Sequence, residues 1–510
     1  MSGETVKQTG WDGTFLGHPK GLFVLFFAEM WERFSYYGMR ALLIFYLTKH
    51  FLFSDNAAYG IYAAYTTLVY ITPVIGGVLA DRYLGQRKAV LWGAVLLVLG
   101  HSGLAYEGPS LSPGEQPAEF TMNVFYFSLA LIIAGVGFLK ANISTIVGEL
   151  YPRTDTRRDS AFTIFYVGIN LGAAAGALLA GYLGETYGWS YGFGAAGIGM
   201  LFGLIIFVLG KPALKGAGEP RDPALLAGPL IMGLNRERLI YIGSIVGIFA
   251  IWLAVRDQGT VNKLLIATGL IVVSYILYRS VFTLPAQARN RIIVGLVLIS
   301  TQVLFWGLFE QAGSSLNIYT DEQVDRTLFG WEVPASMFQS INAIYIVVLG
   351  PLFASMWIWL GNRGLEPSTP VKFGLALAQL GLGFLVLVWG GQSSDGLTPV
   401  IFIFLIYLLH TTGELFLSPV GLSAITRLSV TNMVGLMMGT WFLASGAGNA
   451  VAGLIAQSTT VAGENGEDVV LQVYANVGLL AIAVGGIMLL LSYPLKRMMH
   501  LETLEDSDPA

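Results

Sequence analysis

Long apolar stretches separated by short polar loops run through the chain from residue 21 to residue 495. Most of them reach or exceed the ~20 residues that a helix needs to cross a bilayer. Inside lipid every backbone amide must be hydrogen-bonded within the protein, so the pattern predicts helices. Fourteen such stretches occur, with approximate bounds 21–51, 58–81, 88–106, 122–150, 160–184, 187–210, 238–255, 262–283, 292–318, 335–360, 371–390, 397–426, 432–457 and 470–495. The pattern therefore predicts an all-α, polytopic membrane protein.

The composition of the 510 residues supports this class and excludes others. Apolar residues make up 55% of the chain and charged residues 12%, about half of the roughly 25% that is typical of a soluble domain. The formal net charge of −4 provides no basic surface for phosphates, so no nucleic-acid partner is expected. The chain has no cysteine, which excludes disulfides and thiolate metal sites.

The distribution of lysine and arginine predicts the orientation of the chain. With the N-terminus in the cytoplasm, 21 of the 28 Lys and Arg residues lie inside and four lie outside. The inside cations belong to the N-terminal segment and to short loops, among them Lys7, Lys20, 82–88, 153–158 and 211–238. The outer loops are acidic instead, and include Glu464, Glu467 and Asp468. This asymmetry follows the positive-inside rule, and an even number of spans places both termini in the cytoplasm.

The order of the stretches indicates two six-helix halves with an inserted hairpin. Six spans are followed by a basic linker, two plain spans without a charge in the membrane, and six further spans. The predicted divisions are a cytoplasmic N-terminal segment 1–20, an N-terminal half 21–210, a cytoplasmic linker 211–237, a transmembrane hairpin 238–290, a C-terminal half 291–497 and a cytoplasmic tail 498–510. This makes 12 core helices and 14 in total.

Ionisable residues lie inside the predicted spans. Each costs about 2.5–3.5 kcal/mol even on a lenient insertion scale, so seven isolated charges would cost on the order of 20 kcal/mol. They must face one another or a wet cavity. A plain interpretation is that they form ion pairs that only hold helices together, although buried pairs rarely add net stability over apolar packing. The seven residues are Glu29, Glu32, Arg33, Arg40, Lys140, Glu310 and Glu414.

The first span presents a stripe of such groups. Glu29, Arg33, Tyr37 and Arg40 are spaced i, i+4, i+8 and i+11, which places them on one helical face. Glu32 lies at the edge of that face. Across the chain, four buried carboxylates stand against three buried cations, so one carboxylate lacks a partner. A carboxylate of this kind is a natural proton carrier, and the count does not say which one it is.

Other polar and aromatic residues occur within the spans: Asn142, Asn170, Asn342, Ser418, Tyr70, Tyr166, Trp306 and Trp441. Singly, each is typical of a packing or capping residue. Together with the seven charges, they indicate a cavity of both charge signs with aromatic walls. Such a cavity suits a small zwitterion, because cations bind a carboxylate and a glutamate binds an ammonium group.

Several weaker patterns indicate packing. Gly168, Gly172 and Gly176 form a double GxxxG, which predicts a helix-packing face. His410 and Glu414 are spaced i, i+4 as in a metal-binding pair, but no third ligand is evident, so neither a metal nor a cofactor is expected. Prolines inside three spans predict helix kinks, at Pro73, Pro351 and Pro419.

Three strings resemble known transporter signatures. The segment 76–88 reads GGVLADRYLGQRK and is similar to the cytoplasmic loop of the major facilitator superfamily. The segments 29–34 and 165–172 read EMWERF and FYVGINLG, and they resemble the proton-dependent oligopeptide transporter family, bacterial type. The arrangement of six, two and six spans also resembles bacterial members, over about residues 20–500. The resemblance implies a proton-coupled symporter of di- and tripeptides, which works by alternating access in the bacterial inner membrane.

The resemblance also implies roles for individual residues. Glu29, Glu32, Arg33 and Glu310 would couple transport to protons. Arg40 and Lys140 would bind the peptide carboxylate, and the peptide amino end would be bound by Asn170, Asn342, Glu414 and Ser418. The side-chain pockets would be lined by Tyr37, Tyr70, Tyr166, Trp306, Phe309 and Trp441. Bridges between the halves would join Arg40 to Glu310 and Lys140 to Glu414.

The chain departs from the family pattern at three positions. Ala173 follows Gly172 where the family often has Ser, Ala63 stands where some members carry a His, and Phe309 stands where some members have a second acid beside Glu310. The last two departures leave proton coupling to the remaining carboxylates. The expected partners are small peptides, protons and membrane lipid, with a monomer as the working unit and protons as the only coupling ion. The alternatives are the same fold with another solute (nitrate, a drug, a sugar or an amino-acid-like compound), a membrane-embedded enzyme, and a structural scaffold or receptor.

Overall fold

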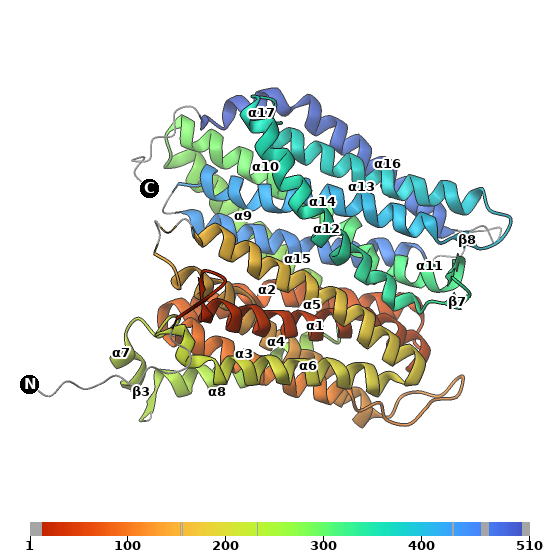
Figure 1. The fold of residues 1–510 in the computed structure, drawn as a ribbon, viewed down its shortest axis with the longest axis horizontal. Coiled ribbons are helices and arrows are strands. Elements are labelled where there is room, and N and C mark those ends of the chain that lie inside the picture. The colour runs from red at the N-terminus through yellow and green to blue at the C-terminus, as the bar shows by residue number, and fades with distance from the viewer. Residues whose placement is uncertain are drawn as a thin grey trace, which may run out of the picture. The chain divides into compact units, whose positions relative to one another are not determined.

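The computed structural model describes residues 13–152, 155, 157–231, 233–430, 433–460 and 469–501. Each of the fourteen apolar stretches contains a long helix, which confirms the all-α fold. These helices are α1 (Lys20–Phe45), α2 (Asp55–Leu79), α3 (Gln86–Leu104), α4 (Glu119–Glu149), α5 (Arg157–Tyr187), α6 (Trp189–Leu209), α8 (Arg236–Ala254), α9 (Gln258–Phe282), α10 (Ala286–Phe309), α12 (Ser340–Asn362), α13 (Thr369–Gln392), α14 (Ile401–Leu428), α15 (Val434–Ser458) and α16 (Val469–Leu490). Figure 1 shows their course.

Eleven helices in the described residues are long and apolar enough to cross a membrane. Helix α1 falls outside this set because its own charges, Glu29, Glu32, Arg33 and Arg40, interrupt every apolar window of sufficient length. Pro73, Pro351 and Pro419 lie inside α2, α12 and α14, as the sequence predicts. Of the residues used above to orient the chain, Lys7, Arg153, Glu464, Glu467 and Asp468 lie outside the described residues.

Short elements join the long helices. Helical turns occur at Tyr46–His50, Ala80–Leu84, Lys211–Leu214, Glu310–Gly313 and Ala335–Gln339, and short helices are α7 (Pro223–Ala227), α11 (Ser315–Gln323) and α17 (Ser492–Met498). Four two-stranded pairs complete the described part. They are β1 (Thr14–Phe15) with β2 (His18–Pro19), β3 (Pro229–Ile231) with β4 (Leu234–Asn235), β6 (Thr327–Leu328) with β7 (Trp331–Glu332), all antiparallel, and β5 (Val324–Asp325) parallel to β8 (Thr398–Pro399).

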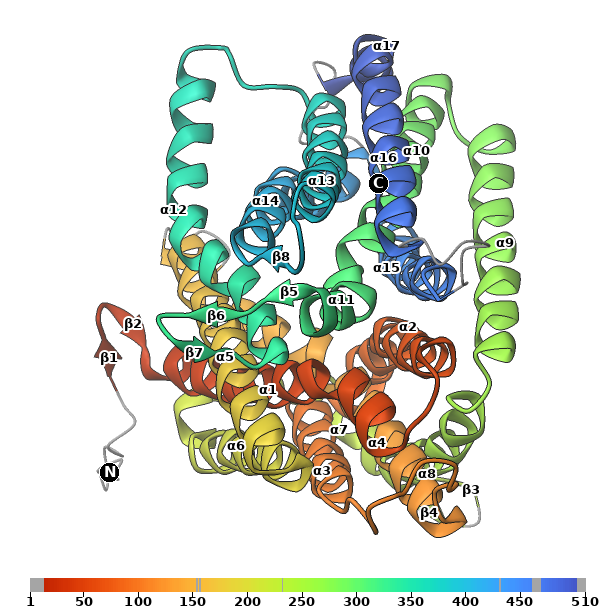
Figure 2. The ribbon, with the colours of Figure 1, turned by 90° about the vertical axis from the view of Figure 1, so that its right-hand side faces the viewer.

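The chain separates into two compact units, the first from residues 1–42 and 71–255 and the second from residues 43–70 and 256–510. In the first unit α3 packs against α4 and α6, α5 packs against α6, and α8 packs on α4. In the second unit α13 packs against α14 and α16, and α10 packs against α15. Helix α12 joins this unit through α14, and α9 joins it through α15 and α10 (Figure 2). The division into two six-helix halves and an inserted hairpin stays a prediction.

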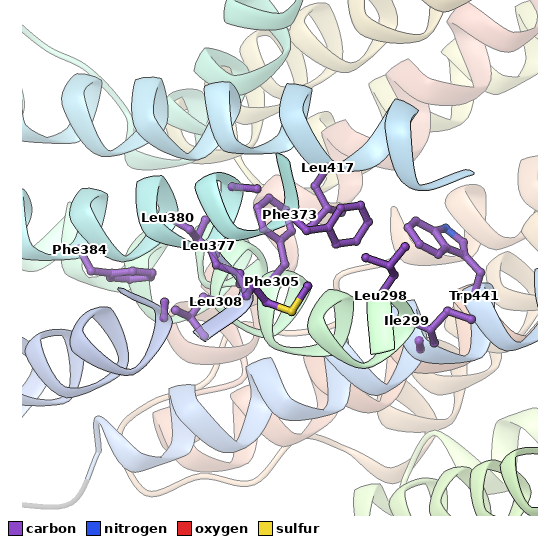
Figure 3. Close-up of a cluster of buried hydrophobic side chains, with 14 of the residues drawn as sticks. Leu298, Ile299, Phe305, Leu308, Phe373, Leu377, Leu380, Phe384, Leu417 and Trp441 are labelled. Carbon is purple, nitrogen blue, oxygen red and sulfur yellow. The ribbon is translucent and has the colours of Figure 1, made fainter. Parts of the chain in front are cut away.

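The core of the second unit is built from side chains of α10, α13, α14 and α15. Leu298, Phe305 and Leu308 of α10 are fully buried or nearly so, as are the α13 residues Leu377 and Phe384. Figure 3 shows these rings and branched side chains in one continuous cluster. Burying each large apolar side chain contributes roughly 1.5–3 kcal/mol, so this cluster fixes the packing of α10 on α13.

A polar contact outside the membrane spans holds the N-terminal strand pair. Arg157 Nη1 donates to the carbonyl oxygen of Gly17, 2.8 Å away, in the turn between β1 and β2. The same guanidinium donates to Asp155, with its Nη2 2.7 Å from Oδ2. These hydrogen bonds from Arg157 lower the pKa of Asp155 to about 2. The contact therefore connects the start of α5 to the N-terminal strand pair.

Candidate functional site

Helix α5 fixes the position of α1 in the first unit through three glycines one turn apart. A Cβ added at Gly168 would meet the Phe26 ring, and one added at Gly176 would meet the carbonyl oxygen of Phe34. A Cβ at Gly172, between them, would meet the carbonyl oxygen of Met30. The two helices therefore touch backbone to backbone, and the predicted packing role of the double GxxxG is confirmed.

Helix α1 also holds a buried acid–base cluster. Arg33 Nε donates to Glu29 Oε1, 2.7 Å away, and lies 3.1 Å from Glu32 Oε2. The exposed fractions are 1% for Glu29, 0% for Glu32 and 6% for Arg33. Lys140 of α4 interacts electrostatically with Glu32. One guanidinium thus faces two carboxylates, with Lys140 as a second cation, and burial of these groups strengthens their electrostatic interactions.

Glu32 is the less satisfied of the two acids. Neither of its side-chain oxygens has a hydrogen-bond partner in the described residues, although Oε2 lies within ion-pair distance of Arg33. For Glu29, only Oε2 lacks such a partner. A buried carboxylate oxygen without a hydrogen bond is costly. The Glu32 carboxyl is therefore the group in this cluster that protonation would stabilise most.

Farther along α1, Arg40 and Tyr37 lie close together. The guanidinium carbon of Arg40 is 5.8 Å from the centroid of the Tyr37 ring, within the range of a cation–π contact. Arg40 is 6% exposed and Tyr37 is half-buried. The stripe predicted from the sequence thus continues along α1 from the acid–base cluster to Arg40.

Two asparagines of the first unit bond mainly within their own helices. Asn170, 5% exposed, donates from Nδ2 to the carbonyl oxygen of Tyr166, 3.0 Å away on α5. Asn142 donates from Nδ2 to the carbonyl oxygens of Phe138 at 2.7 Å and Gly76 at 3.4 Å. Asn142 thus ties α4 to α2 and acts as a packing residue. The Tyr166 side chain is 44% exposed.

The second unit places a carboxylate beside an amide. Asn342 of α12 donates from Nδ2 to Glu414 Oε2 of α14, 3.0 Å away, and to Thr411 Oγ1, also 3.0 Å away. Glu310 is 3% exposed, begins the turn that follows α10, and interacts electrostatically with Glu414. Two acids and an amide, from α12, α14 and the turn after α10, therefore interact. Ser418 lies one turn beyond Glu414 on α14 and is half-buried.

Two aromatic side chains of α10 stand shortly before Glu310 in the chain. The Trp306 and Phe309 rings lie 5.2 Å apart in an edge-to-face arrangement, and both are half-buried. Trp441 of α15 is 4% exposed and packs in the apolar core, where Figure 3 shows it beside Leu298 and Ile299. Tyr70 of α2 is half-buried.

Polar residues outside the predicted set also contact the candidate residues. Thr411 receives the second hydrogen bond from Asn342, and Gln302 donates from Nε2 to Ser445 Oγ at 2.6 Å and to the carbonyl oxygen of Trp441 at 3.3 Å. Helical spacing was the available signal, because Thr411 stands three residues before Glu414 and Gln302 four residues before Trp306. The predicted bridges Arg40–Glu310 and Lys140–Glu414 each pair residues of different units, and they stay predictions.

No group of three or more metal-ligating side chains occurs in the residues that the structure describes. His410, considered above with Glu414, is 2% exposed and packs on Phe384, with ring centroids 4.9 Å apart. Its ring also bonds the backbone of Leu380. His410 is therefore a hydrogen-bonded core residue.

Comparisons with known proteins agree on one family. The family model described as "POT family" matches residues 87–473. An uncharacterized transporter of Bacillus subtilis, YclF, is 38% identical over 508 residues, which cover 97% of each chain. The di-/tripeptide transporter of Lactococcus lactis subsp. lactis is 34% identical over 511 residues, covering 95% of this chain and 97% of that one. The crystal structure of a peptide transporter named POT, in complex with alafosfalin, matches with a TM-score of 0.82 at 35% identity, over 96% of this chain and 98% of that one.

Proposed function

This chain belongs to the POT family, and from that premise we propose that it is a proton-coupled symporter that imports di- and tripeptides by alternating access. The observation that supports the proton coupling best is the buried arrangement of Arg33 between Glu29 and Glu32. The name of the Lactococcus relative supports di- and tripeptides as substrates. In this mechanism two six-helix halves rock about a site near the middle of the membrane.

Protonation of the α1 cluster would change its charge balance. When Glu32 takes up a proton, its attraction for Arg33 falls, while Arg33 keeps Glu29 as a partner at 2.7 Å. We assign coupling roles to Glu29, Glu32, Arg33 and Glu310, because Glu310 is a second buried acid with another carboxylate as its neighbour. A proton on one of two interacting acids removes their mutual repulsion.

The two ends of a peptide require opposite charges. We assign the peptide carboxylate to Arg40 and Lys140, and the amino end to Glu414 with Asn342, whose hydrogen bond already orients the carboxylate. Asn170 and Ser418 would assist at the amino end. Aromatic rings accept varied side chains through apolar contact. The proposed pocket residues are Tyr37, Tyr70, Tyr166, Trp306, Phe309 and Trp441, and the proposed bridges between halves are Arg40–Glu310 and Lys140–Glu414.

The membrane potential would drive accumulation. A zwitterionic peptide is neutral, so one accompanying proton gives the complex a single positive charge, and the field contributes about 2.3 kcal/mol per charge per 100 mV. We place the protein in the bacterial inner membrane with both termini in the cytoplasm. In this proposal it works as a monomer, uses protons as the only coupling ion, needs no cofactor and leaves the peptide bond intact.

The test uses purified protein in liposomes and labelled dialanine, with an acid-outside gradient. We expect uptake above equilibrium in the wild type and in Glu115→Gln, which alters an exposed loop acid, and loss of that accumulation with a protonophore and in Glu32→Gln. Equal accumulation by Glu32→Gln and the wild type would contradict the role of Glu32. Recovery of peptide fragments instead of intact dialanine would indicate an enzyme.

The alternative is the same fold with another solute. Nitrate needs cations but no ammonium partner, so the Asn342–Glu414 contact favours a zwitterion over nitrate. If dialanine neither enters the liposomes nor competes for entry, the peptide assignment is wrong. Thermal-shift screening of anions, drugs and amino-acid-like compounds would then identify the substrate class.

A further inference from the structure

The first unit contains an apolar groove that the transport mechanism does not use. Its volume is about 460 Å³, within the roughly 300–1,000 Å³ of common ligand sites, and it lies between α2, α4 and α8. Its walls include Ile75 and Leu79 of α2, Phe138 of α4, and Leu239 and Ile251 of α8. All three helices are candidate membrane spans, so the medium that reaches this groove is the lipid of the bilayer.

Helix α8 is held in place by contacts along one edge of the face that lines the groove, and Ser244 belongs to both. Trp92 Nε1 donates to Ser244 Oγ, 3.0 Å away, and the Trp92 ring lies 5.0 Å from the Tyr241 ring. Ile248, one turn beyond Ser244, is 3% exposed. These contacts fix α8 against α3 and α4, so the groove beside α8 is a permanent feature of the helix packing.

Two glycines keep the floor of the groove open. A Cβ added at Gly243 or at Gly247 would meet no atom within 4 Å, so larger side chains there would project into free space. On the opposite wall, Ile75 is 61% exposed. The groove is therefore empty because small residues line α8, and something apolar must cover Ile75.

One end of the groove is basic. Arg236, the first residue of α8, lines it and donates from Nη1 to the carbonyl oxygen of Leu225, 2.8 Å away. Among the described residues, no carboxylate lies within ion-pair distance of Arg236, so most of its guanidinium donors remain available. Guanidinium groups bind phosphate well, and basic pockets between helices on the cytoplasmic side bind anionic lipid head groups.

The dimensions suit a lipid chain. From Arg236 to Ile251 the helix rises about 22 Å. One leaflet of the hydrocarbon core is about 15 Å thick, so an acyl chain that starts near Arg236 covers about two thirds of this length and passes Gly243 to reach about the level of Gly247. A peptide or another polar solute would find mainly apolar contacts along this length, with Thr72 and Ser244 as hydroxyl groups in the lining.

We propose that this groove binds one anionic phospholipid, with its phosphate at Arg236 and an acyl chain against Gly243 and Gly247. The charge of Arg236 selects the head group, and the glycines admit the chain. Such a lipid would fill the gap between α8 and α2.

The test uses a phosphatidylglycerol that carries a photoreactive diazirine in one acyl chain, added to the purified full-length protein in detergent with dioleoyl lipids. We expect cross-links to peptides of α2 and α8 around Ile75 and Gly247. The same diazirine chain on phosphatidylcholine should give about fivefold less product, because one basic residue at the surface contributes about that preference for an anionic lipid.

Matched variants separate binding in the groove from general contact with the bilayer. Gly243→Leu and Gly247→Leu fill the groove and should abolish the cross-link, whereas Gly269→Leu on α9, where an added Cβ also meets nothing, should not. Arg236→Gln should remove the head-group preference, and its exposed neighbour Arg238 provides the control Arg238→Gln.

Three results would overturn the proposal. The first is equal labelling by the two head groups, which would mean ordinary bilayer contact. The second is unchanged labelling in both leucine variants while they elute as single folded species. The third is cross-links between two protein copies at α8, which would show that a second chain covers the groove.

Discussion

Replacing Gly172 by alanine tests whether the backbone contact between α5 and α1 supports the acid–base cluster. The added Cβ would overlap the carbonyl oxygen of Met30 and lie 3.1 Å from the Cβ of Arg33. A carbonyl oxygen cannot move by changing a rotamer, so α1 itself must shift. Overpacking of this kind costs about 1–3 kcal/mol. The shift would also act on Arg33, whose distance to Glu32 is already 3.1 Å.

The assay is thermal unfolding of the purified protein in detergent, with Gly194→Ala as the matched control. A Cβ at Gly194 meets no atom within 4 Å, so this variant gains only the helix propensity of alanine, up to about 1 kcal/mol. Both variants gain this propensity, so we expect Gly172→Ala to be less stable than Gly194→Ala by the overpacking cost alone, about 1–3 kcal/mol. If Gly172→Ala melts at or above the temperature of Gly194→Ala, the two helices are not locked by this contact.

Three further predictions concern other contacts. Asn342→Leu removes the donor to Glu414 and should lower the free energy of unfolding by about 1–3 kcal/mol, measured by thermal unfolding; unchanged stability would show that this hydrogen bond is not formed. Because Arg157 lowers the pKa of Asp155 from 3.8 to about 2, that contact is fully present above pH 4 and is lost as the pH falls toward 2. Pepsin cleavage of the β1–β2 segment, normalised to an unfolded peptide, should therefore rise over this range in the wild type and be flat in Asp155→Asn; identical profiles would contradict the contact. Trp441→Ala empties a buried core site and should cost about 3–5 kcal/mol, whereas a shift below 1 kcal/mol in chemical denaturation would show that the indole is not packed.

The long helices were predictable because each depends on a local property. An apolar run of sufficient length becomes a helix in lipid whatever surrounds it, as α4 and α16 illustrate. The ion pair of Glu29 with Arg33 follows from i, i+4 spacing for the same reason. Local sequence patterns therefore carry both the fold class and half of the α1 cluster.

Features that depend on distant partners could not be predicted. The stretch 292–318 lies within one candidate span, Ala286–Gln323, as predicted, but its α-helix ends at Phe309, continues as the turn Glu310–Gly313 and resumes at Ser315. There Gln311 donates to the carbonyl oxygens of Gly307 and, from α15, of Ala452, at 2.9 and 3.0 Å. A bond across 141 residues leaves no periodic signal. The same holds for Asn342 and Glu414, which stand 72 residues apart on different helices.

Contact through glycines would also limit how α1 responds to the proposed protonation of its acid–base cluster. Side chains at an interface can absorb a small displacement by changing rotamers, but Gly168, Gly172 and Gly176 have none to change. In the proposed mechanism, a rearrangement that begins at Arg33 would therefore displace α1 and α5 together as one rigid unit. Spin labels placed on the lipid-facing sides of these two helices would then keep a constant separation while the rest of the protein changes shape.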